Sequence, residues 1–329
     1  MQPSYAAYFD IPNLMTLEFS VQQIDTLILP EHSGSMLRGA FGNALRLLTC
    51  VTDLSDCALC PLKAHCKFPR IFETRALTAS QTVNPYIIHP PATKTLCAGD
   101  IWHFSMSMMG AAIEDCALIV QAWRSALQQG LGSRAPYQKA RLLQVSCDDE
   151  LIYDAKQSSQ LLSTPNSVTR LYRHPLLMND APLSQLRLEF LTPFRHQQDG
   201  KIAARADMLD SVTFLASLYN RIRLCQRHHS KDLPWNIGYQ DYHEFKAAIA
   251  SLDIQSDVAP NKVTRRSNRQ ERKMQLFGLQ GQIDLIDIKK TGNLIKLLPA
   301  LQLGEILHIG KNTTMGLGQY QLKKVAVIK

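Results

Sequence analysis

The sequence lacks the features that direct a protein into or across a membrane. None of its uninterrupted apolar stretches approaches the roughly 20 residues of a membrane-spanning helix. The segment from Met1 to Asp10 also lacks a basic stretch followed by an apolar one, which is the pattern of a secretory signal. Together these absences predict a cytoplasmic protein.

Three common catalytic signatures are absent as well. The chain has no Gly-x-Ser-x-Gly elbow, no Walker-type phosphate loop after a strand, and no His-Glu-x-x-His. The dipeptide Gly310-Lys311 lacks the Gly-x4-Gly-Lys spacing, and a predicted strand rather than a helix follows it. These absences argue against an esterase, an NTPase and a zinc protease.

Positive charge is in moderate excess. Lysine and arginine number 36 against 28 acidic residues, which gives a formal net charge of +8 and a pI near 9.1. Basic side chains neutralise phosphate groups and release counterions, so nucleic acid is the first partner to expect. An anionic membrane surface is the second, although many basic proteins bind neither.

The apolar pattern repeats itself along the chain, and a length of 329 residues favours two domains. Each half predicts strand, helix, strand, helix and strand in succession. The predicted strands are 14–29, 100–109, 141–146, 151–153, 186–191, 276–288 and 319–328, and the predicted helices are 36–48, 111–129, 208–226, 242–249 and 293–307. Residues 156–184 between the halves are rich in Ser, Asn, Gln and Pro, as in a linker or a crossing loop. We predict an α+β protein of two tandem ferredoxin-like (RRM-like) domains, residues 1–160 and 161–329.

Four of the eight cysteines lie close together after the first predicted helix. Cys50, Cys57, Cys60 and Cys66 are spaced C-x6-C-x2-C-x5-C. Four thiolates in a short excursion fit tetrahedral zinc, and C-x2-C is a common half-site. An iron–sulfur cluster or plain reduced thiols fit this irregular spacing equally. We expect these cysteines to cross-link a short loop inserted in the first domain. We name residues 50–66 the cysteine knuckle.

The first predicted helix carries a second, polar pattern. Arg38, Gly42 and Arg46 follow one another at four-residue steps on the face opposite the apolar stripe. A large ligand could lie between the two guanidinium groups. Alternatively, the glycine allows close packing and the arginines only face solvent.

A second group of arginines lies between residues 263 and 273. If this segment is a strand, alternation places Arg265, Arg266 and Arg269 where they can meet a polyanion. A solvated loop is the alternative.

The segment between the last helix and the last strand is rich in glycine, and we name residues 308–320 the glycine loop. Gly310, Gly316 and Gly318 can adopt positive φ and turn main-chain N–H groups toward one anion, beside Lys311. Taken alone, an ordinary helix-to-strand turn explains the same residues.

A basic surface with a few histidines suits RNA cleavage without a metal ion. In that reaction the 2′-hydroxyl attacks its own phosphate, so a base, an acid and cationic stabilisation suffice. His32 precedes the helix that bears Arg38, and we predict it as the proton carrier. His308 competes with it, although a structural hydrogen bond within the glycine loop also accounts for that residue.

Several segments, in this order, resemble the CRISPR-associated endoribonucleases of the RAMP superfamily that process precursor CRISPR RNA. The segments are Leu37 to Arg46, the cysteine knuckle, Pro85 to Pro91, Thr192 to Arg195, Arg266 to Gln270 and the glycine loop. The resemblance implies two ferredoxin-like domains and a metal-independent cut beside the stem-loop of the CRISPR repeat RNA. It also implies a glycine loop that contacts RNA, and a product retained as a guide for other subunits of an effector complex.

The residue patterns and the resemblance together give a set of expected site residues. The chemistry is assigned to His32 and Arg38. The RNA contacts expected are Arg46, Arg265, Arg266, Arg269, His308, Gly310, Lys311, Gly316 and Gly318. No cofactor is expected for catalysis, and zinc is expected only as a structural ion at the cysteine knuckle.

One position departs from the pattern of this family. Asn43 stands where many relatives of this branch have a histidine, and an asparagine does not exchange protons at neutral pH. Two alternatives therefore stay open. One is a non-catalytic RNA-binding subunit of a CRISPR ribonucleoprotein, and the other is a metal-dependent nucleic-acid module built on the cysteines.

Overall fold

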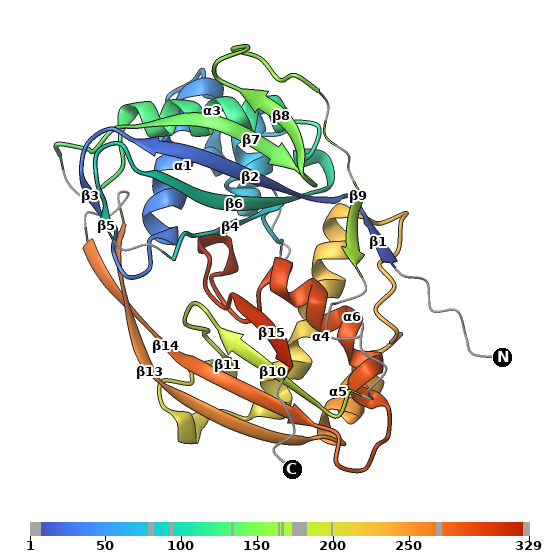
Figure 1. The fold of residues 1–329 in the computed structure, drawn as a ribbon. Coiled ribbons are helices and arrows are strands. Elements are labelled where there is room, and N and C mark those ends of the chain that lie inside the picture. The colour runs from blue at the N-terminus through green and yellow to red at the C-terminus, as the bar shows by residue number, and fades with distance from the viewer. Residues whose placement is uncertain are drawn as a thin grey trace.

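The computed structural model describes residues 8–77, 82–92, 95–132, 135–163, 165, 168–172, 183–198, 200–267 and 272–324. The chain has an α+β fold built on two curled sheets, each with helices packed against it (Figure 1). Two large apolar cores accompany them.

The first sheet has seven strands, and β2 lies at its centre. Its strands are β1 (Tyr8–Pro12), β2 (Leu14–Gln23), β4 (Tyr86–His89), β6 (Ile101–Met109), β7 (Ala140–Cys147), β8 (Glu150–Asp154) and β9 (Val168–Tyr172). β2 pairs antiparallel with β6 on one side and β7 on the other, and β4 pairs with β6. The order β4-β6-β2-β7 places the first and third of these four strands in the middle.

Two helices cover one face of the first sheet: α1 (Gly34–Thr49) and α3 (Cys116–Gln129). Alternate residues of β2 from Met15 to Val21 are buried beneath them. Phe41 of α1 stacks on Trp123 of α3 with ring centroids 5.1 Å apart. The opposite face of the sheet carries polar side chains, including Thr16 and Ser107, whose hydroxyl groups hydrogen-bond at 2.8 Å.

The second sheet has the order β13-β14-β10-β15. Its strands are β10 (Gln185–Phe190), β13 (Asp253–Ser267), β14 (Arg272–Ile286) and β15 (Tyr320–Lys324), and its helices are α4 (Ser211–His229), α5 (Tyr242–Ala250) and α6 (Asn293–Leu307). The last helix is buried almost all round, because its apolar residues occupy every face rather than one stripe.

The hairpin of β13 and β14 is the longest feature of the second sheet and extends to α1 of the first half (Figure 1). Val263 and Leu276 from this hairpin form a small buried cluster with Met315 and Leu317 of the glycine loop. The glycine loop therefore packs between the hairpin and the first half.

The remaining described elements are short. They are β3 (Leu27–Ile28), β5 (Thr95–Leu96), β11 (Gln197–Gln198), β12 (Lys201–Ile202), α2 (Lys67–Ile71) and the 3-10 turns η1 (Cys57–Leu59), η2 (Thr74–Ala76), η3 (Gly110–Ala112), η5 (Ala206–Met208) and η6 (Thr313–Met315). Among the described helices, none has both the length and the apolarity needed to cross a bilayer.

Most predicted elements are confirmed, and α6 has the predicted bounds, 293–307. Other strands were missed or shortened. The strands β1 and β4 are absent from the predicted set, β9 lies inside the predicted linker, and β13 begins at Asp253 rather than near residue 263. β9 forms because β1, which is distant in sequence, supplies its partner, whereas β13 pairs with its hairpin neighbour β14.

Candidate nucleic-acid interface

A cleft of about 1070 Å³ lies between the two halves of the molecule. The first half contributes Arg38 of α1, Asp56 and Ala58 of the cysteine knuckle, and residues 72–76 and 82–84. The second half contributes residues 195–197, one face of α4 and residues 310–315 of the glycine loop. The cleft thus exists only because segments that are distant in sequence come together.

The walls of the cleft are strongly basic. Seven cations line it: Arg38, Arg75, Arg195, Arg221, Arg223, Arg227 and Lys311. Two acids, Asp56 and Glu73, also line it, so the local formal balance is seven minus two, or +5. A low-dielectric cleft lined by one sign of charge concentrates its field and attracts a polyanion.

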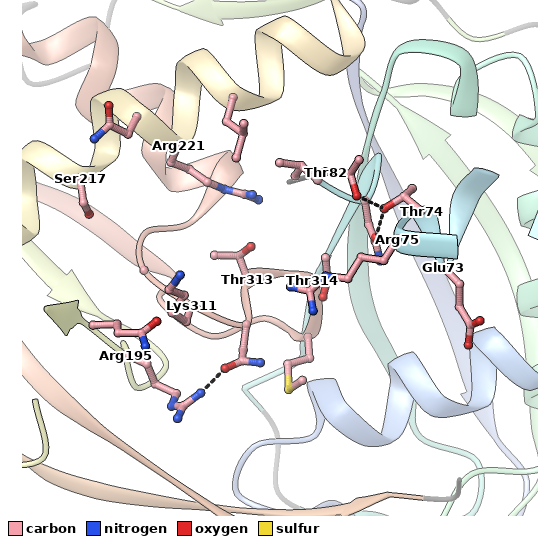
Figure 2. Close-up of a pocket in the computed structure, with 18 of the residues that line it drawn as sticks. Glu73, Thr74, Arg75, Thr82, Arg195, Ser217, Arg221, Lys311, Thr313 and Thr314 are labelled. Atoms are coloured by element: carbon pink, nitrogen blue, oxygen red, sulfur yellow. Dashed lines mark hydrogen bonds between the residues drawn. The ribbon is translucent and has the colours of Figure 1, made fainter. Parts of the chain in front are cut away.

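The side chains come from three directions. Figure 2 shows Arg221 on one wall, Arg75 and Thr82 on the opposite wall, and Thr313 and Thr314 between them. A ligand in the cleft therefore meets cations on both sides and hydroxyl groups on the floor.

Three of the arginines form hydrogen bonds with other parts of the chain. Arg221 donates through Nε and Nη2 to the Leu307 carbonyl oxygen at 3.3 and 3.2 Å, which ties α4 to the end of α6. Arg223 donates to the Tyr239 carbonyl oxygen at 2.6 Å. Arg195 donates to the Phe277 carbonyl oxygen at 2.9 Å and to Asn312 Oδ1.

The other cations are not paired within the described part of the chain. The exposed side chains of Arg75, Arg227 and Lys311 make no hydrogen bond or ion pair with another described residue. Arg38 lies over the Phe72 ring at 4.2 Å, and its buried Nε has no partner among the described residues. The three exposed side chains can bind phosphate without first breaking an internal contact.

A hydroxyl network lines the wall formed by the first half. The Thr74 hydroxyl donates to Asn84 Oδ1 at 2.7 Å and lies 3.1 Å from the Thr82 hydroxyl (Figure 2). Asn84 Nδ2 donates to the Phe72 carbonyl oxygen at 2.9 Å. This network holds residues 72–76, and with them Arg75, beside the cleft.

The glycine loop packs against both halves. Gly316 and Gly318 have φ of 84° and 75°, and a Cβ on either would overlap Pro90 or the Ile309 carbonyl oxygen. Their N–H groups donate within the chain, to Thr313 and Pro193 carbonyl oxygens at 2.9 Å each. The loop therefore presents Lys311 and its threonines to the cleft, while these two glycine N–H groups are already bonded.

The predicted arginine pair of α1 is split between two surroundings. Arg38 lines the cleft, but Arg46 lies over the Phe68 ring at 5.7 Å and donates to the Leu54 carbonyl oxygen. The space beside Gly42 is filled by the Phe72 ring. The glycine thus allows close packing, and the gap between the two guanidinium groups is not open to a ligand.

The arginines predicted near residue 265 lie at the end of the long hairpin. Arg265 and Arg266 belong to β13 and pair in register with Met274 and Lys273 of β14. Arg269 lies outside the described residues.

His308 is fully buried and does not face the cleft. Its Nε2 lies 3.0 Å from Nδ1 of His89, whose Nε2 lies 2.8 Å from the Ser107 hydroxyl. Burial lowers the pKa of His89 to about 4 and also lowers the pKa of His308, so both rings are neutral. The structural role considered for His308 agrees with this placement, because the pair joins the glycine loop to β4.

His32 lies outside the cleft wall, in the turn that enters α1. Its Nε2 is 3.2 Å from Asn261 Oδ1 on β13. Two residues further on, Gly34 packs directly against the Met315 carbonyl group of the glycine loop. The structure therefore places His32 at the junction of α1, the hairpin and the glycine loop.

Sequence reasoning gave no role to another histidine, His196, which lines the cleft beside Arg195. It is 5% exposed, and burial lowers its pKa. Its Nε2 has no partner among the described residues. No local motif marks His196, and only its position after the Thr192 to Arg195 segment could have drawn attention to it.

The four cysteines of the knuckle line a separate cavity of about 220 Å³. All four are free thiols. No three His, Cys, Asp or Glu side chains of the described chain stand in positions that would hold a metal ion.

Two family models match the chain. Residues 11–166 match a model described as an N-terminal domain, and residues 188–320 match the model of the CRISPR-associated endoribonuclease Cas6. No curated protein matches the sequence.

Solved structures share the fold at low sequence identity. A chain of a partial Cas6-RT-Cas1–Cas2 complex is 14% identical with a TM-score of 0.53, and the match covers 96% of this chain and 47% of that one. This chain thus spans about half the length of that relative. Thermus thermophilus Cas6 is 12% identical with a TM-score of 0.51, covering 97% of this chain and all (100%) of that one.

The structure of a Cas6 product complex is similar to this chain to the same degree. It is 14% identical with a TM-score of 0.50, and the match covers 94% of this chain and 100% of that one. These likenesses establish the fold, and the matched family model covers the second half, with the cleft wall formed by α4. Residues 188–320, which include this wall of the cleft, thus carry the signature of the Cas6 family of CRISPR-associated endoribonucleases.

Proposed function

We propose that this protein cleaves the repeat RNA of a CRISPR precursor transcript and holds that RNA in the basic cleft. The observation that carries the proposal is a set of unpaired cations facing one cavity within a Cas6-family fold. An RNA strand has a phosphate at every nucleotide, so cations on both walls can track its backbone. Such an enzyme works in the cytoplasm, where the transcript is made.

The fold supports a finer description. In both sheets the four central strands follow the order second, third, first, fourth along the chain, as in a ferredoxin-like unit. We therefore propose two ferredoxin-like domains with a boundary near residue 160, although β9 crosses back to pair with β1. Sheets of this kind are a common platform for RNA.

Cleavage without a metal ion needs a base, an acid and charge stabilisation at the phosphorane. Arg38 suits the last role, because it lines the cleft and its guanidinium is held over Phe72. Planar guanidinium groups bind two phosphate oxygens at once, which favours the more highly charged transition state.

His32 is proposed as the proton carrier, and its hydrogen bonds define which nitrogen is available. Asn261 Nδ2 donates to Gln280 Oε1 at 2.8 Å, which leaves Asn261 Oδ1 as the acceptor toward His32. His32 Nε2 therefore carries the hydrogen, and Nδ1 is the nitrogen that accepts a proton from a 2′-hydroxyl. Asn261 orients the ring as the third member of a triad does.

A cleavage assay with repeat RNA in EDTA tests this function. We expect a product that ends in a cyclic phosphate, and a cleavage rate about 100-fold lower for His32→Ala, the usual loss for an acid–base group. Arg38→Ala should lower the rate with little change in RNA binding. His196→Ala is the matched control from the cleft wall, and a larger loss there than in His32→Ala would transfer the proton role to His196.

A non-catalytic RNA-binding subunit is the second candidate function. It is favoured by Asn43, which is exposed on α1 and exchanges no proton, and by the position of His32 outside the cleft wall. Tight binding of repeat RNA that stays intact across pH 5 to 9 would select this function. Partner subunits of a CRISPR complex would then cleave the RNA.

A further inference from the structure

The cysteine knuckle has its apolar side chains on the outside. Val51 and Leu59 are 80% and 79% exposed, and Leu54 and Leu62 are 44% and 45% exposed. Segments of this length fold only against a larger core or around a disulfide or metal ion, because the apolar area that they bury themselves is too small to stabilise a fold. The exposed leucines and valine show that burial of large apolar side chains is not what holds this excursion together.

The thiols point the other way, into one small cavity. Cys50, Cys57, Cys60 and Cys66 all line it, and its other walls include Phe68. Cys57 is buried and the other three are half-buried. The four cysteines therefore share a mostly apolar cavity of their own, while Asp56 and Ala58 of the knuckle line the neighbouring RNA cleft.

Three of the sulfur atoms converge on the end of α1. Cys60 Sγ lies 3.5 Å from the Thr52 hydroxyl, and Cys66 Sγ lies 4.0 Å from the Thr49 carbonyl oxygen. Thr49 and Thr52 flank Cys50 in the sequence, so Cys60 and Cys66 both approach the segment that carries Cys50.

The fourth sulfur is brought close by a tight turn. The Cys60 N–H donates to the Cys57 carbonyl oxygen at 3.3 Å, so the C-x2-C segment is already curled into the turn that a metal half-site uses. All four cysteines line the same cavity, although the loop must still contract to bring their sulfur atoms to one centre.

We propose that the cysteine knuckle binds one structural zinc ion through Cys50, Cys57, Cys60 and Cys66. Four thiolates satisfy the tetrahedral preference of zinc, with each sulfur about 2.3 Å from the ion. Binding displaces the thiol protons and leaves no open coordination position, so the ion holds the loop and takes no part in RNA cleavage. His65 lines the same cavity but is not needed as a ligand.

The zinc content of the full chain, purified under reducing conditions, tests this proposal. We expect one zinc per chain, and content lower by about tenfold in Cys57→Ser and Cys60→Ser, because each removes a ligand. Cys97→Ser, which changes an exposed thiol outside the knuckle, and His65→Ala should keep the zinc. Cobalt exchanged into the site should show sulfur-to-cobalt charge-transfer absorption.

Alkylation of the wild-type protein supplies a test that does not depend on whether the variants fold. With zinc bound, the four knuckle thiols should resist iodoacetamide while Cys97 reacts, and a strong chelator should expose all four. RNA cleavage should continue after chelation, so a loss of zinc and a loss of the proposed function are separate results. Protein that neither contains nor takes up zinc, that contains iron and sulfide instead, or whose zinc survives Cys57→Ser would overturn the proposal.

Discussion

The glycine loop and the cysteine knuckle are both irregular connections, but they are held in opposite ways. In the glycine loop Thr313, Met315 and Leu317 are buried, its main chain hydrogen-bonds to Pro193 and Arg195 of the second half, and it packs against the first half. In the knuckle the large apolar side chains face solvent and the cysteines face inward. The comparison shows that packing alone accounts for the conformation of the glycine loop. The cysteine knuckle lacks such packing and needs cross-links between its cysteines.

The largest expected effect tests how tightly the glycine loop is packed. Gly318→Val should lower the free energy of unfolding by about 3 kcal/mol or more, since φ is positive and the new side chain overlaps Ile309. Thermal and urea unfolding measure the loss. The matched control is Gly200→Val, with φ of 78° and open space around it, which should cost only about 1–2 kcal/mol. Equal losses would mean that the loop is not closely packed.

The pH dependence of stability tests the role of the histidine pair that joins the glycine loop to β4. Burial keeps His89 and His308 neutral in the folded protein, while the unfolded chain binds their protons below about pH 6.5. Stability should therefore be intact above that pH and fall, as pH decreases toward about 4, by about 1.4 kcal/mol per pH unit for each ring.

Urea unfolding at pH 7, 6 and 5 measures this slope. Changing both rings to glutamine should reduce the slope, whereas changing the exposed His103 to glutamine should leave it unchanged. Part of the slope should survive the double change, because burial also lowers the pKa of His229 to about 4. A double variant with an unchanged slope would contradict the assignment.

RNA affinity tests what the glycine loop presents to the cleft. Lys311→Ala should weaken binding about tenfold, because one charge-assisted phosphate contact contributes about 1.5 kcal/mol. The slope of log affinity against log salt should fall by about 0.7 to 0.9. Lys289→Ala removes an exposed charge outside the cleft and should do neither.

The smallest expected effect concerns the knuckle. Arg46→Ala removes the hydrogen bond to Leu54 and the contact with Phe68, and should cost about 1 kcal/mol. Hydrogen exchange should increase in residues 50–66 while the glycine loop stays protected. Replacement of Arg141, an exposed residue of β7, by alanine serves as the control. Faster exchange in both loops after Arg46→Ala would mean that the two loops are not held in different ways.

The sequence predicted the elements better than the cleft. The bounds of α6 were predicted correctly because a leucine-rich, mostly apolar segment lies between Gly292 and the glycine loop. Arg75 and Arg221 face one cavity only because the two halves pack together, and no local pattern records that packing. The cysteine spacing did indicate a shared site, since its four residues lie within one short segment.

Gly316 packs against Pro90, and this contact has a consequence for the order of folding. The two residues are separated by most of the chain, so their contact closes a very long loop and forms late. A chain that lacks the glycine loop still holds the arginines of α1 and α4, and His229 and Trp235 still hydrogen-bond to the first half. The floor of the cleft and Lys311 are missing from it, so we expect the basic groove to be completed only when the glycine loop has packed against Pro90.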